Sequence, residues 1–112
     1  MTGGASQVGS HIAEQLLEGG AREVVLLDNL SLGSSEMLQP LLADARCTLV
    51  RADVMRLNDL IDAFAGKDGV FAVAALMASS IGRDPWTGID VNVRGLQNTL
   101  EACRHQRVRK GA

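Results

Sequence analysis

The spacing of apolar residues changes from a helical to a strand-like pattern near residue 20. Val8, Ile12 and Leu16 recur every four positions, which predicts an amphipathic helix. The glycine pair at 19–20 is typical of a helix end. The apolar run within 23–28 is continuous rather than alternating, which favours a strand covered on both faces of a parallel sheet.

The middle of the chain repeats this alternation of helix and strand. Residues 29–35 are polar and contain a glycine, which predicts a loop, and residues 36–42 follow as a short helix that Pro40 bends or interrupts. A short apolar run at 48–50 predicts a second strand that ends near Asp53. Apolar residues at helical spacing then mark one face of a further helix: Leu57, Leu60, Ile61 and Phe64.

The last third of the chain predicts one more strand and a long helix. The strand covers 69–75 and opens into a loop of small residues over 77–82. Asp84 and Pro85 are typical of a helix start, a capping acid followed by proline in the first turn. Apolar residues at helical spacing predict the buried face of this helix: Ile89, Val93, Leu96, Leu100 and Cys103.

This order of elements is the pattern of a doubly wound α/β fold, in which helices cover both faces of a parallel sheet. In that fold a strand precedes the turn into the first helix, and here only Met1 stands before that turn. The missing strand would lie between the strands at 23–28 and 69–75, so its absence predicts a gap of roughly 10 Å. We therefore expect an incomplete Rossmann-like domain over 1–112 that lacks its first strand and everything after its fourth helix.

Composition and charge narrow the class of protein. The 112 residues are 46% apolar and 21% charged, which indicates a globular chain of one domain at most. The formal net charge of −2 gives no general attraction to nucleic acid or to an anionic membrane. No apolar run has the length of a bilayer span and no signal-peptide pattern follows Met1, so the expected location is the cytoplasm.

The cysteines and the basic residues are explained by structural roles. Cys47 and Cys103 have no C-x-x-C spacing and no second ligand nearby, which favours two buried thiols over a disulfide or a metal site. The basic residues within 104–110 suit the C-terminal end of the last helix and solvent. No aromatic residue is interleaved with them, which argues against nucleic-acid contact.

The most specific chemical signal is a glycine-rich turn followed by an acid at a strand end. The turn into the first helix has the sequence Thr2-Gly3-Gly4-Ala5-Ser6-Gln7-Val8-Gly9. The separation of Gly9 from Asp28 is close to the roughly 20 residues that lie between the phosphate-binding turn and the ribose-binding acid of a dinucleotide site. The pair predicts a nicotinamide or flavin dinucleotide.

Five short blocks of sequence, taken together in their order and spacing, form a recognisable pattern. They are Thr2-Gly3-x-x-Ser6-x-x-Gly9-Ser10-His11, Leu27-Asp28-Asn29-Leu30-Ser31-x-Gly33, Asp53-Val54, Val73-Ala74-Ala75 and Asp90-Val91-Asn92-Val93-Arg94-Gly95. Together they resemble the NAD-dependent epimerase/dehydratase family, the extended short-chain dehydrogenases that act mainly on nucleotide sugars. The resemblance covers nearly all of residues 2–110, and five ordered blocks are far more specific than one glycine motif.

The resemblance gives the residues of the turn distinct roles. Gly3 permits the tight turn, and Gly9 lets the first helix pack close to the sheet. The backbone N–H groups of Gln7, Val8 and Gly9 are expected to face the pyrophosphate at the helix N-terminus. Ser6 departs from the family, which usually has glycine there, and its hydroxyl either donates a hydrogen bond to the cofactor or crowds it.

The acid and the loop after it are expected to bind the adenosine ribose. The Asp28 carboxylate would accept both ribose hydroxyls and repel the extra phosphate of NADP, and no arginine follows directly to receive that phosphate. The expected cofactor is therefore NAD. By resemblance, Asn29, Leu30 and Ser31 form the family's loop around the same ribose.

The resemblance implies a cofactor or support role for several further positions, and each of them also has a purely structural explanation. Asp53 would accept from the adenine amino group while Val54 packs on the ring, although Asp53 alone is equally well explained as a helix cap. Asn92 matches the helix asparagine that supports the active-site backbone and a water, and a satisfied surface amide is the alternative. Three small residues let a dinucleotide cross their strand end, and core packing explains them equally well: Val73, Ala74 and Ala75.

The chemistry of the resembled family needs residues that this sequence does not contain. Hydride transfer there uses a Tyr-x-x-x-Lys pair and a Ser or Thr that binds the reacting oxygen, and the chain has no tyrosine. No catalytic residue and no metal ligand is therefore predicted. We interpret the chain as the NAD-binding portion of a nucleotide-sugar epimerase or dehydratase, truncated at both ends, that works by transient hydride transfer between NAD and a sugar carbon.

A second function class explains the same motifs. A non-catalytic dinucleotide-binding or sensor module, completed by a partner that lends a strand, would keep the cofactor side without the catalytic side. For the full-length protein, the resemblance implies a nucleotide-sugar substrate and a homodimer that pairs through the helix over 84–104.

Overall fold

The computed structural model describes residues 1–32 and 34–112. Gly33, the last residue of the second sequence block, lies outside the described residues. The elements in chain order are α1 (Gln7–Glu18), β1 (Val24–Asp28), η1 (Ser35–Leu38), α2 (Gln39–Leu42), β2 (Cys47–Arg51), α3 (Leu57–Phe64), β3 (Gly69–Val70), α4 (Ala78–Arg83), α5 (Pro85–Ile89), η2 (Asp90–Gly95), α6 (Leu96–Gln106) and β4 (Lys110–Gly111).

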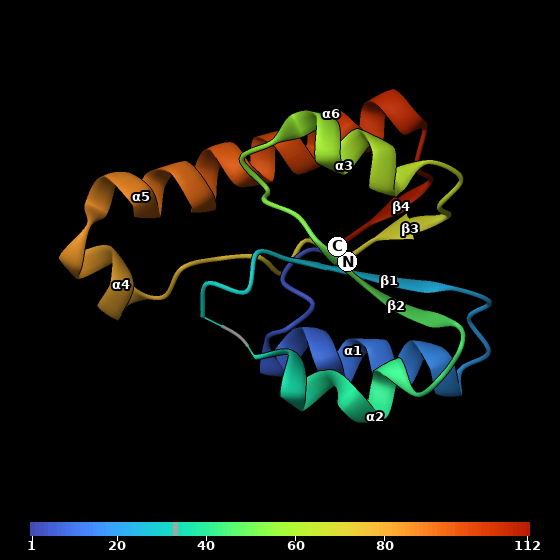
Figure 1. Cartoon of the computed structure of the whole chain (residues 1–112). Helices are drawn as coiled ribbons and strands as arrows, with labels where there is room; N and C mark the ends of the chain where they lie inside the picture. The colour runs from blue at the N-terminus through green and yellow to red at the C-terminus, as the bar shows by residue number, and fades with distance from the viewer. Residues whose placement is uncertain (33) are drawn as a thin grey trace.

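Parallel strands and the first residues of the chain form one row of backbone (Figure 1). β1 pairs with β2 in parallel, and β3 pairs with β4 in parallel. Between these pairs, Thr2 forms parallel bridges to Leu27 on one side and to Ala72 on the other. The row is therefore β2, β1, residues 1–2, β3 and β4, so residues 1–2 lie where the sequence predicts the first strand of a doubly wound fold.

Hydrogen bonds hold these first residues between the two strand pairs. The Met1 amine donates to Val25 O at 2.8 Å, and Met1 O accepts from Leu27 N at 2.8 Å. On the other side, Thr2 N donates to Phe71 O at 2.9 Å. The predicted gap between the strands is thus bridged at its carboxyl end, while its amino end stays open.

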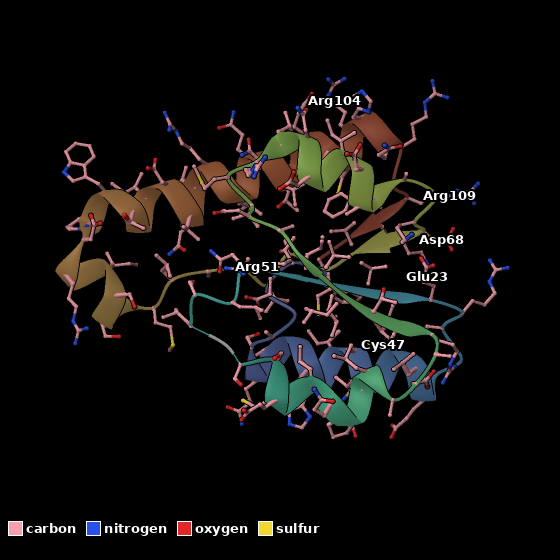
Figure 2. The ribbon with its side chains drawn as sticks, viewed as in Figure 1. Glu23, Cys47, Arg51, Asp68, Arg104 and Arg109 are labelled. Carbon is pink, nitrogen blue, oxygen red and sulfur yellow. The ribbon has the colours of Figure 1, made fainter. Side chains whose placement is uncertain are left out.

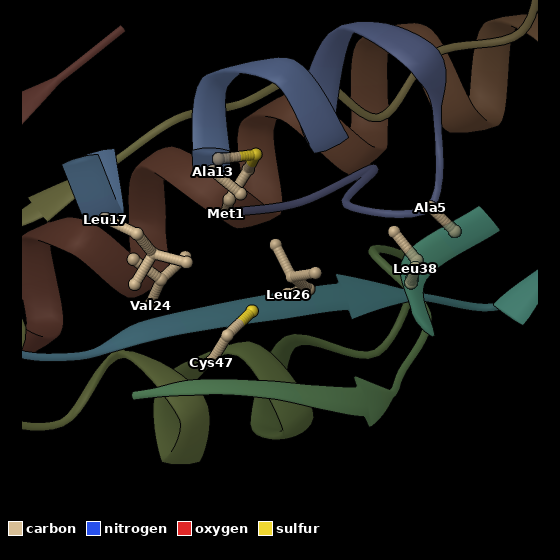
Figure 3. Close-up of a cluster of buried hydrophobic side chains, with 8 residues drawn as sticks. All are labelled: Met1, Ala5, Ala13, Leu17, Val24, Leu26, Leu38 and Cys47. Atoms are coloured by element: carbon tan, nitrogen blue, oxygen red, sulfur yellow. The ribbon is translucent and has the colours of Figure 1, made fainter. Parts of the chain in front are cut away.

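Helices cover both faces of the row, with α1 and α2 on one face and α3 and α6 on the other (Figure 1). A buried cluster lies between β1 and the helices of the first face (Figure 3): Met1, Ala5, Ala13, Leu17, Val24, Leu26, Leu38 and Cys47. Another lies toward α3 and α6: Leu27, Leu60, Phe64, Val70 and Ala102. Neighbouring residues of β1 therefore enter opposite clusters, as the two-residue period of a strand requires.

The first helices end and begin where the sequence predicts. α1 ends before the glycine pair, and Gly20 has a φ of +92°, which glycine adopts without strain. The predicted helix over 36–42 is split into η1 and α2. Pro40 lies in the first turn of α2, where its missing N–H removes no helical hydrogen bond.

The predicted strand over 69–75 is shorter in the structure. β3 covers two residues, and Ala72 adds a single bridge to Thr2. The chain after Ala72 contacts the glycine turn instead of a neighbouring strand, which ends the ladder. The expectation that nothing follows the fourth helix is also corrected, because β4 pairs with β3 after α6.

The predicted loop over 77–82 is a helix, α4. The N–H groups of Ser80 and Ile81 both donate to Met77 O, at 2.9 and 3.0 Å, which starts the helix. Packing stabilises it, because a Cβ on Gly88 would lie 2.7 Å from Ile81 Cγ1, so Ile81 rests directly on the α5 backbone. Such a tertiary contact overrides the weak local preference of small residues for a loop.

The predicted buried face of the last helix is wrong at four positions. Side chains predicted to be buried are exposed: Ile89, Val93, Leu96 and Leu100. The buried positions are instead small residues, which let the helix approach its neighbours: Gly88, Gly95, Thr99 and Ala102. η2 is a π-helical segment between α5 and α6. Cys103, which was also predicted to be buried, is half-buried against the second cluster.

Both cysteines are free thiols. Cys47 is buried and Cys103 half-buried, neither forms a disulfide, and burial raises the pKa of both thiols. Over residues 1–32 and 34–112, no helix is both long and apolar enough to cross a bilayer. The same part of the chain holds no group of three or more histidine, cysteine or acidic residues placed to bind a metal.

Candidate functional site

The glycine-rich turn is fixed to the carboxyl end of β1. Gly4 N donates to Leu27 O at 3.1 Å, and Ala5 N donates to Asp28 Oδ2 at 2.9 Å. A Cβ on Gly4 would lie 2.6 Å from Leu26 Cβ, so the turn lies directly on the strand. The main chain of the turn and the acid at the strand end are therefore parts of one structure.

The other side of the turn lies against the chain that continues from β3. Gly3 has a φ of +69°, and a Cβ there would lie 2.6 Å from Ala74 N, so only glycine permits this backbone contact. Val73 N donates to Thr2 O at 3.2 Å, and Ala74 N donates to Thr2 Oγ1 at 3.4 Å. Val73 and Ala74 are half-buried and Ala75 is exposed, so the structure brings this small-residue segment to the turn.

Ser6 caps α1 and links its first turn to Gly3. The Ser6 hydroxyl donates to Gly3 O at 2.7 Å and accepts from Gly9 N at 3.0 Å. Its one proton is therefore used inside the turn and is not available to a cofactor unless that bond breaks. The expectation of a free N–H at Gly9 is corrected, because that group is bonded to Ser6.

The N–H groups of Gln7 and Val8 remain at the mouth of α1. The first helical bond joins Ser10 N to Ser6 O at 2.9 Å, and in the described part of the chain no acceptor pairs with the N–H of Gln7 or Val8. Both side chains are exposed. Unpaired N–H groups at the positive end of a 12-residue helix are suited to a phosphate.

The Asp28 carboxylate lies beside this helix mouth. Its Oδ2 accepts from Ala5 N at 2.9 Å, and its Oδ1 accepts from Leu30 N at 2.8 Å. A carboxylate offers about four lone-pair sites, so each oxygen can accept a further hydrogen bond. The structure thus places the acid at the position that its spacing from Gly9 predicts.

The loop after Asp28 is shaped by its own side chains. Asn29 Oδ1 accepts from Ser31 N at 3.0 Å, which is an Asx turn. Leu30 has a φ of +59°, and its side chain packs against the first buried cluster. Asn29 and Ser31 are exposed, so polar groups of the loop face solvent next to the acid.

Asp53 lies at the end of the neighbouring strand. Ala52 N donates to Asp28 O at 3.1 Å, so Asp53 follows one residue after this contact. Asp53 Oδ1 accepts from Met55 N at 2.9 Å, while the residue that caps α3 is Arg56. The alternative interpretation of Asp53 as a helix cap is therefore wrong, because its carboxylate shapes the turn before the helix instead.

Val54 packs between this turn and the long helix. A Cβ on Gly95 would lie 2.6 Å from Val54 Cγ2, and Asn98 Nδ2 donates to Val54 O at 2.9 Å. The Val54 side chain is half-buried, so part of it remains open to a ligand.

Asn92 fastens the π-helical segment to the chain after Ala75. Its Oδ1 accepts from Leu76 N at 2.7 Å, and its Nδ2 donates to Leu76 O at 3.0 Å. The amide therefore satisfies both backbone groups of one residue at the end of the small-residue segment. The role that the resemblance implies, support of site backbone, is compatible with this geometry.

We expect Asn92→Ala to lower the free energy of unfolding by about 2 kcal/mol, because two hydrogen bonds to half-buried backbone are lost. The exposed Asn58 of α3 has no side-chain hydrogen bond in the described residues, and it supplies the matched control. Asn58→Ala should change stability by less than about 0.5 kcal/mol. Urea denaturation followed by circular dichroism measures both, and equal losses would contradict the role of the Leu76 contact.

Several residues of the site carry no signal that sequence reasoning used. Ala5 and Leu76 act through backbone groups, which almost every residue type carries. Their side chains therefore give no sign of this role in the sequence. Thr2 is 1% exposed and uses both its carbonyl and its hydroxyl, although the sequence analysis quoted it only as the first residue of the first block. Arg51 is exposed at the carboxyl end of β2 (Figure 2), opposite Asp28 in the strand register, and pairing of the strands is needed to find it.

The arrangement fits a dinucleotide. Unpaired N–H groups at a helix N-terminus suit a diphosphate, and a carboxylate with spare acceptor sites suits a ribose diol. These groups meet at the carboxyl ends of parallel strands, where open α/β sheets bind ligands. The residues present therefore fit the group that the sequence predicts.

Comparison with known proteins agrees with this geometry. The sequence model of the NAD-dependent epimerase/dehydratase family matches residues 1–111. A UDP-glucose 4-epimerase of Lacticaseibacillus casei is 32% identical over 112 residues, which cover 96% of this chain and 32% of that protein.

Solved structures of proteins with NAD bound are also similar to this chain. A dTDP-glucose 4,6-dehydratase double mutant from Streptomyces venezuelae with NAD bound has a TM-score of 0.92 at 31% identity, over 98% of this chain and 36% of that one. A UDP-glucose 4-epimerase of Thermus thermophilus in complex with NAD has a TM-score of 0.84 at 35% identity, over 98% of this chain and 34% of that one.

The chain spans about a third of the length of the relatives that it matches. The matched part is Rossmann-like in each of these structures, which confirms the predicted fold class. NAD, the cofactor predicted from the sequence, is the cofactor of the matched family. This chain belongs to the NAD-dependent epimerase/dehydratase family.

Proposed function

We propose that this chain is the NAD-binding portion of a nucleotide-sugar epimerase or dehydratase. The observation that carries the proposal is the 2.9 Å hydrogen bond from Ala5 N to Asp28 Oδ2, which joins the acid to the turn at the mouth of α1. In a dinucleotide, the diphosphate is attached to the adenosine ribose, so its two binding groups must be neighbours in this way.

Each part of the site has a role in this proposal. The N–H groups of Gln7 and Val8 hold the pyrophosphate, and Gly3 permits the tight turn that leads into them. Asp28 accepts the ribose hydroxyls, with the loop over 29–31 beside them. When bound, NAD supplies a hydride acceptor, and the residues of this chain bind and orient it.

The adenine and nicotinamide ends have separate support. Asp53 and Val54 lie at the neighbouring strand end and are assigned to the adenine, because the half-buried Val54 side chain offers an apolar surface. The small residues Val73, Ala74 and Ala75 let the dinucleotide cross their strand end. Asn92 holds the backbone beyond them through Leu76.

The proposed reaction belongs to the whole protein. The relatives include UDP-glucose 4-epimerases and a dTDP-glucose 4,6-dehydratase, all nucleotide-sugar enzymes by name. We therefore assign a nucleotide sugar as the substrate class, with hydride transfer between a sugar carbon and NAD as the reaction type.

The proposal predicts that the purified chain binds NAD about tenfold or more tightly than NADP, because the Asp28 carboxylate repels the extra phosphate. Isothermal titration calorimetry measures both dissociation constants under one set of conditions. Raising the salt concentration should reduce the preference, since exposed charges are screened. Equal binding of both nucleotides, or tighter binding of NADP, would contradict the assignment of Asp28.

A homodimer is a further part of the proposal. The helix over 84–104 presents an apolar stripe to solvent, and its side chains are 46% to 80% exposed: Trp86, Ile89, Val93, Leu96 and Leu100. Large apolar side chains that gather on one helix face are typical of a surface that another protein covers. We assign this surface to a second copy of the chain.

Replacing Val93 and Leu100 together by lysine is therefore expected to convert a dimer into a monomer, because charged side chains would be buried between the copies. Met37→Lys is the matched control, since Met37 is 58% exposed on the remote segment η1. Sedimentation velocity measures the masses. A wild-type chain that is monomeric at every accessible concentration would contradict the dimer.

A further inference from the structure

Asp28 and Arg51 are the last residues of the neighbouring parallel strands β1 and β2. The strand register pairs them directly, and Ala52 N donates to Asp28 O at 3.1 Å immediately beyond the pair. Neighbouring strands lie about 4.8 Å apart. The two residues are therefore close in space at the carboxyl end of the strands, where the candidate dinucleotide site lies (Figure 2).

Both side chains leave the same face of the strands. Side chains alternate between the two faces along a strand, so residues two positions apart share a face. Leu26 of β1 lies in the first buried cluster, and Leu49 of β2 packs against it. Asp28 and Arg51 each follow one of these leucines by two positions, so both side chains project on the side that α1 and α2 cover.

The Arg51 side chain is exposed, and its guanidinium forms no hydrogen bond or ion pair within residues 1–32 and 34–112. Arg46 and Arg104, by contrast, each hold an acid, at 2.7 and 2.6 Å. A guanidinium carries five N–H donors in a planar fork that matches a phosphate group. An unpaired arginine at the edge of a nucleotide site is therefore suited to phosphate oxygens.

The Asp28 carboxylate is held by the glycine turn and the loop rather than by Arg51. Its Oδ2 accepts from Ala5 N at 2.9 Å, and its Oδ1 accepts from Leu30 N at 2.8 Å. No ion pair joins it to Arg51 in the part of the chain that the structure describes. Acid and guanidinium thus remain neighbours without neutralising each other in direct contact.

The two charges act in opposite directions on one chemical group of the ligand. NADP differs from NAD by a phosphate on the 2′-hydroxyl of the adenosine ribose, whose hydroxyls Asp28 is proposed to accept. The Asp28 charge repels this phosphate, and a cation beside Asp28 attracts it. The loop that follows Asp28 supplies no arginine for this phosphate, whereas the pairing of β1 with β2 brings one beside it.

We propose that Arg51 is a second residue that sets nucleotide specificity, with its guanidinium as the group that receives the 2′-phosphate of NADP; this inference rests on the proposed function. Asp28 makes NAD the preferred nucleotide, and Arg51 limits the loss of affinity for NADP. A purely structural role has a different signature. If Arg51 only offset the repulsion between Asp28 and Asp53, its loss would affect both nucleotides equally.

The test compares NAD and NADP binding by isothermal titration calorimetry on the whole chain. Arg51→Ala should weaken NADP binding about tenfold and NAD binding less than about twofold, so the preference for NAD should increase. Arg51→Lys keeps the charge but loses the planar fork, so its NADP affinity should lie between those of the wild-type chain and Arg51→Ala. Because Arg51 is exposed, both variants should fold normally.

A matched control removes the same charge at the opposite end of the strands. Arg22 is exposed and precedes β1 at its amino end, so Arg22→Ala should leave the nucleotide preference unchanged. A second background reports on Arg51 even where NADP binding by the wild-type chain is weak. Asp28→Ser removes the repulsion and should bind NADP more tightly than NAD, and adding Arg51→Ala should abolish that preference.

Equal losses of NAD and NADP affinity in Arg51→Ala, or no loss of either, would overturn the role of Arg51 while leaving the proposed function intact. An unchanged NADP preference in the double variant would do the same. A wild-type chain that binds neither nucleotide would overturn the proposed function itself, and the role of Arg51 with it.

Discussion

Gly9→Ala is expected to lower the free energy of unfolding by about 3 kcal/mol, although alanine is normally the better helix former. A Cβ at position 9 would lie 2.4 Å from Gly3 O and 3.0 Å from Gly4 Cα. Both neighbours are backbone atoms of a turn that is bonded to β1, so they cannot yield without moving the turn. The steric effect therefore outweighs the gain in helix propensity, which is about 1 kcal/mol.

A glycine to alanine substitution at a site with free space is expected to raise the free energy of unfolding. Gly82 lies in α4 without a positive φ, and no atom stands within 4 Å of the Cβ it lacks. Gly82→Ala should raise the free energy of unfolding by about 0.5 to 1 kcal/mol. Urea denaturation of the three chains measures both effects, and a stable Gly9→Ala chain with full NAD affinity would refute the close contact at the turn.

Asp28→Ala is expected to weaken NAD binding about a hundredfold, which corresponds to about 2.8 kcal/mol. The substitution removes the ribose acceptor and also frees the N–H groups of Ala5 and Leu30, which the carboxylate now holds. Hydrogen bonds to a charged group each contribute about 1.5 to 3 kcal/mol, so the turn itself should loosen. Calorimetry measures the affinity, and thermal unfolding measures the stability.

Two further variants separate binding from folding at this position. Asp28→Asn keeps an acceptor for one of the two amides, so it should retain more stability than Asp28→Ala and still lose most of the NAD affinity. Asp62 is exposed on α3 and its side chain forms no hydrogen bond in the described residues, so Asp62→Ala is the matched control. Unchanged NAD affinity in a folded Asp28→Ala chain would remove the main support for the proposed function.

Local pattern identified the elements that depend on short-range physics. The period of Val8, Ile12 and Leu16 defined α1, and the continuous run before Asp28 defined β1, because side-chain spacing alone distinguishes a helix from a buried strand. The distance between Gly9 and Asp28 in the sequence was also sufficient to predict that turn and acid would meet. A helix and a strand each have a fixed rise per residue, so a separation in the sequence corresponds to a separation in space.

The long helix shows where such reasoning stops. A regular 3.6-residue repeat predicted that Val93 and Leu100 would be buried, whereas both are exposed and the small residues Gly95 and Thr99 are buried instead. Tertiary contacts set which face is buried, Val54 against Gly95 and Asn92 on Leu76, and spacing along the helix does not contain them. That residues 78–83 form the helix α4 and not a loop depends in the same way on a tertiary contact, the packing of Ile81 against Gly88.

The sequence by itself determined the alternation of helix and strand and the turn with its acid, because these depend on residues whose separation along the chain fixes their geometry. The resemblance of the five ordered blocks was sufficient to identify the family and its cofactor. Only the tertiary structure decided that small residues rather than large ones face α3, and that the Asn92 amide holds the backbone of Leu76. These features arise where segments distant in the sequence meet, and the free energy of that contact is not contained in any local pattern.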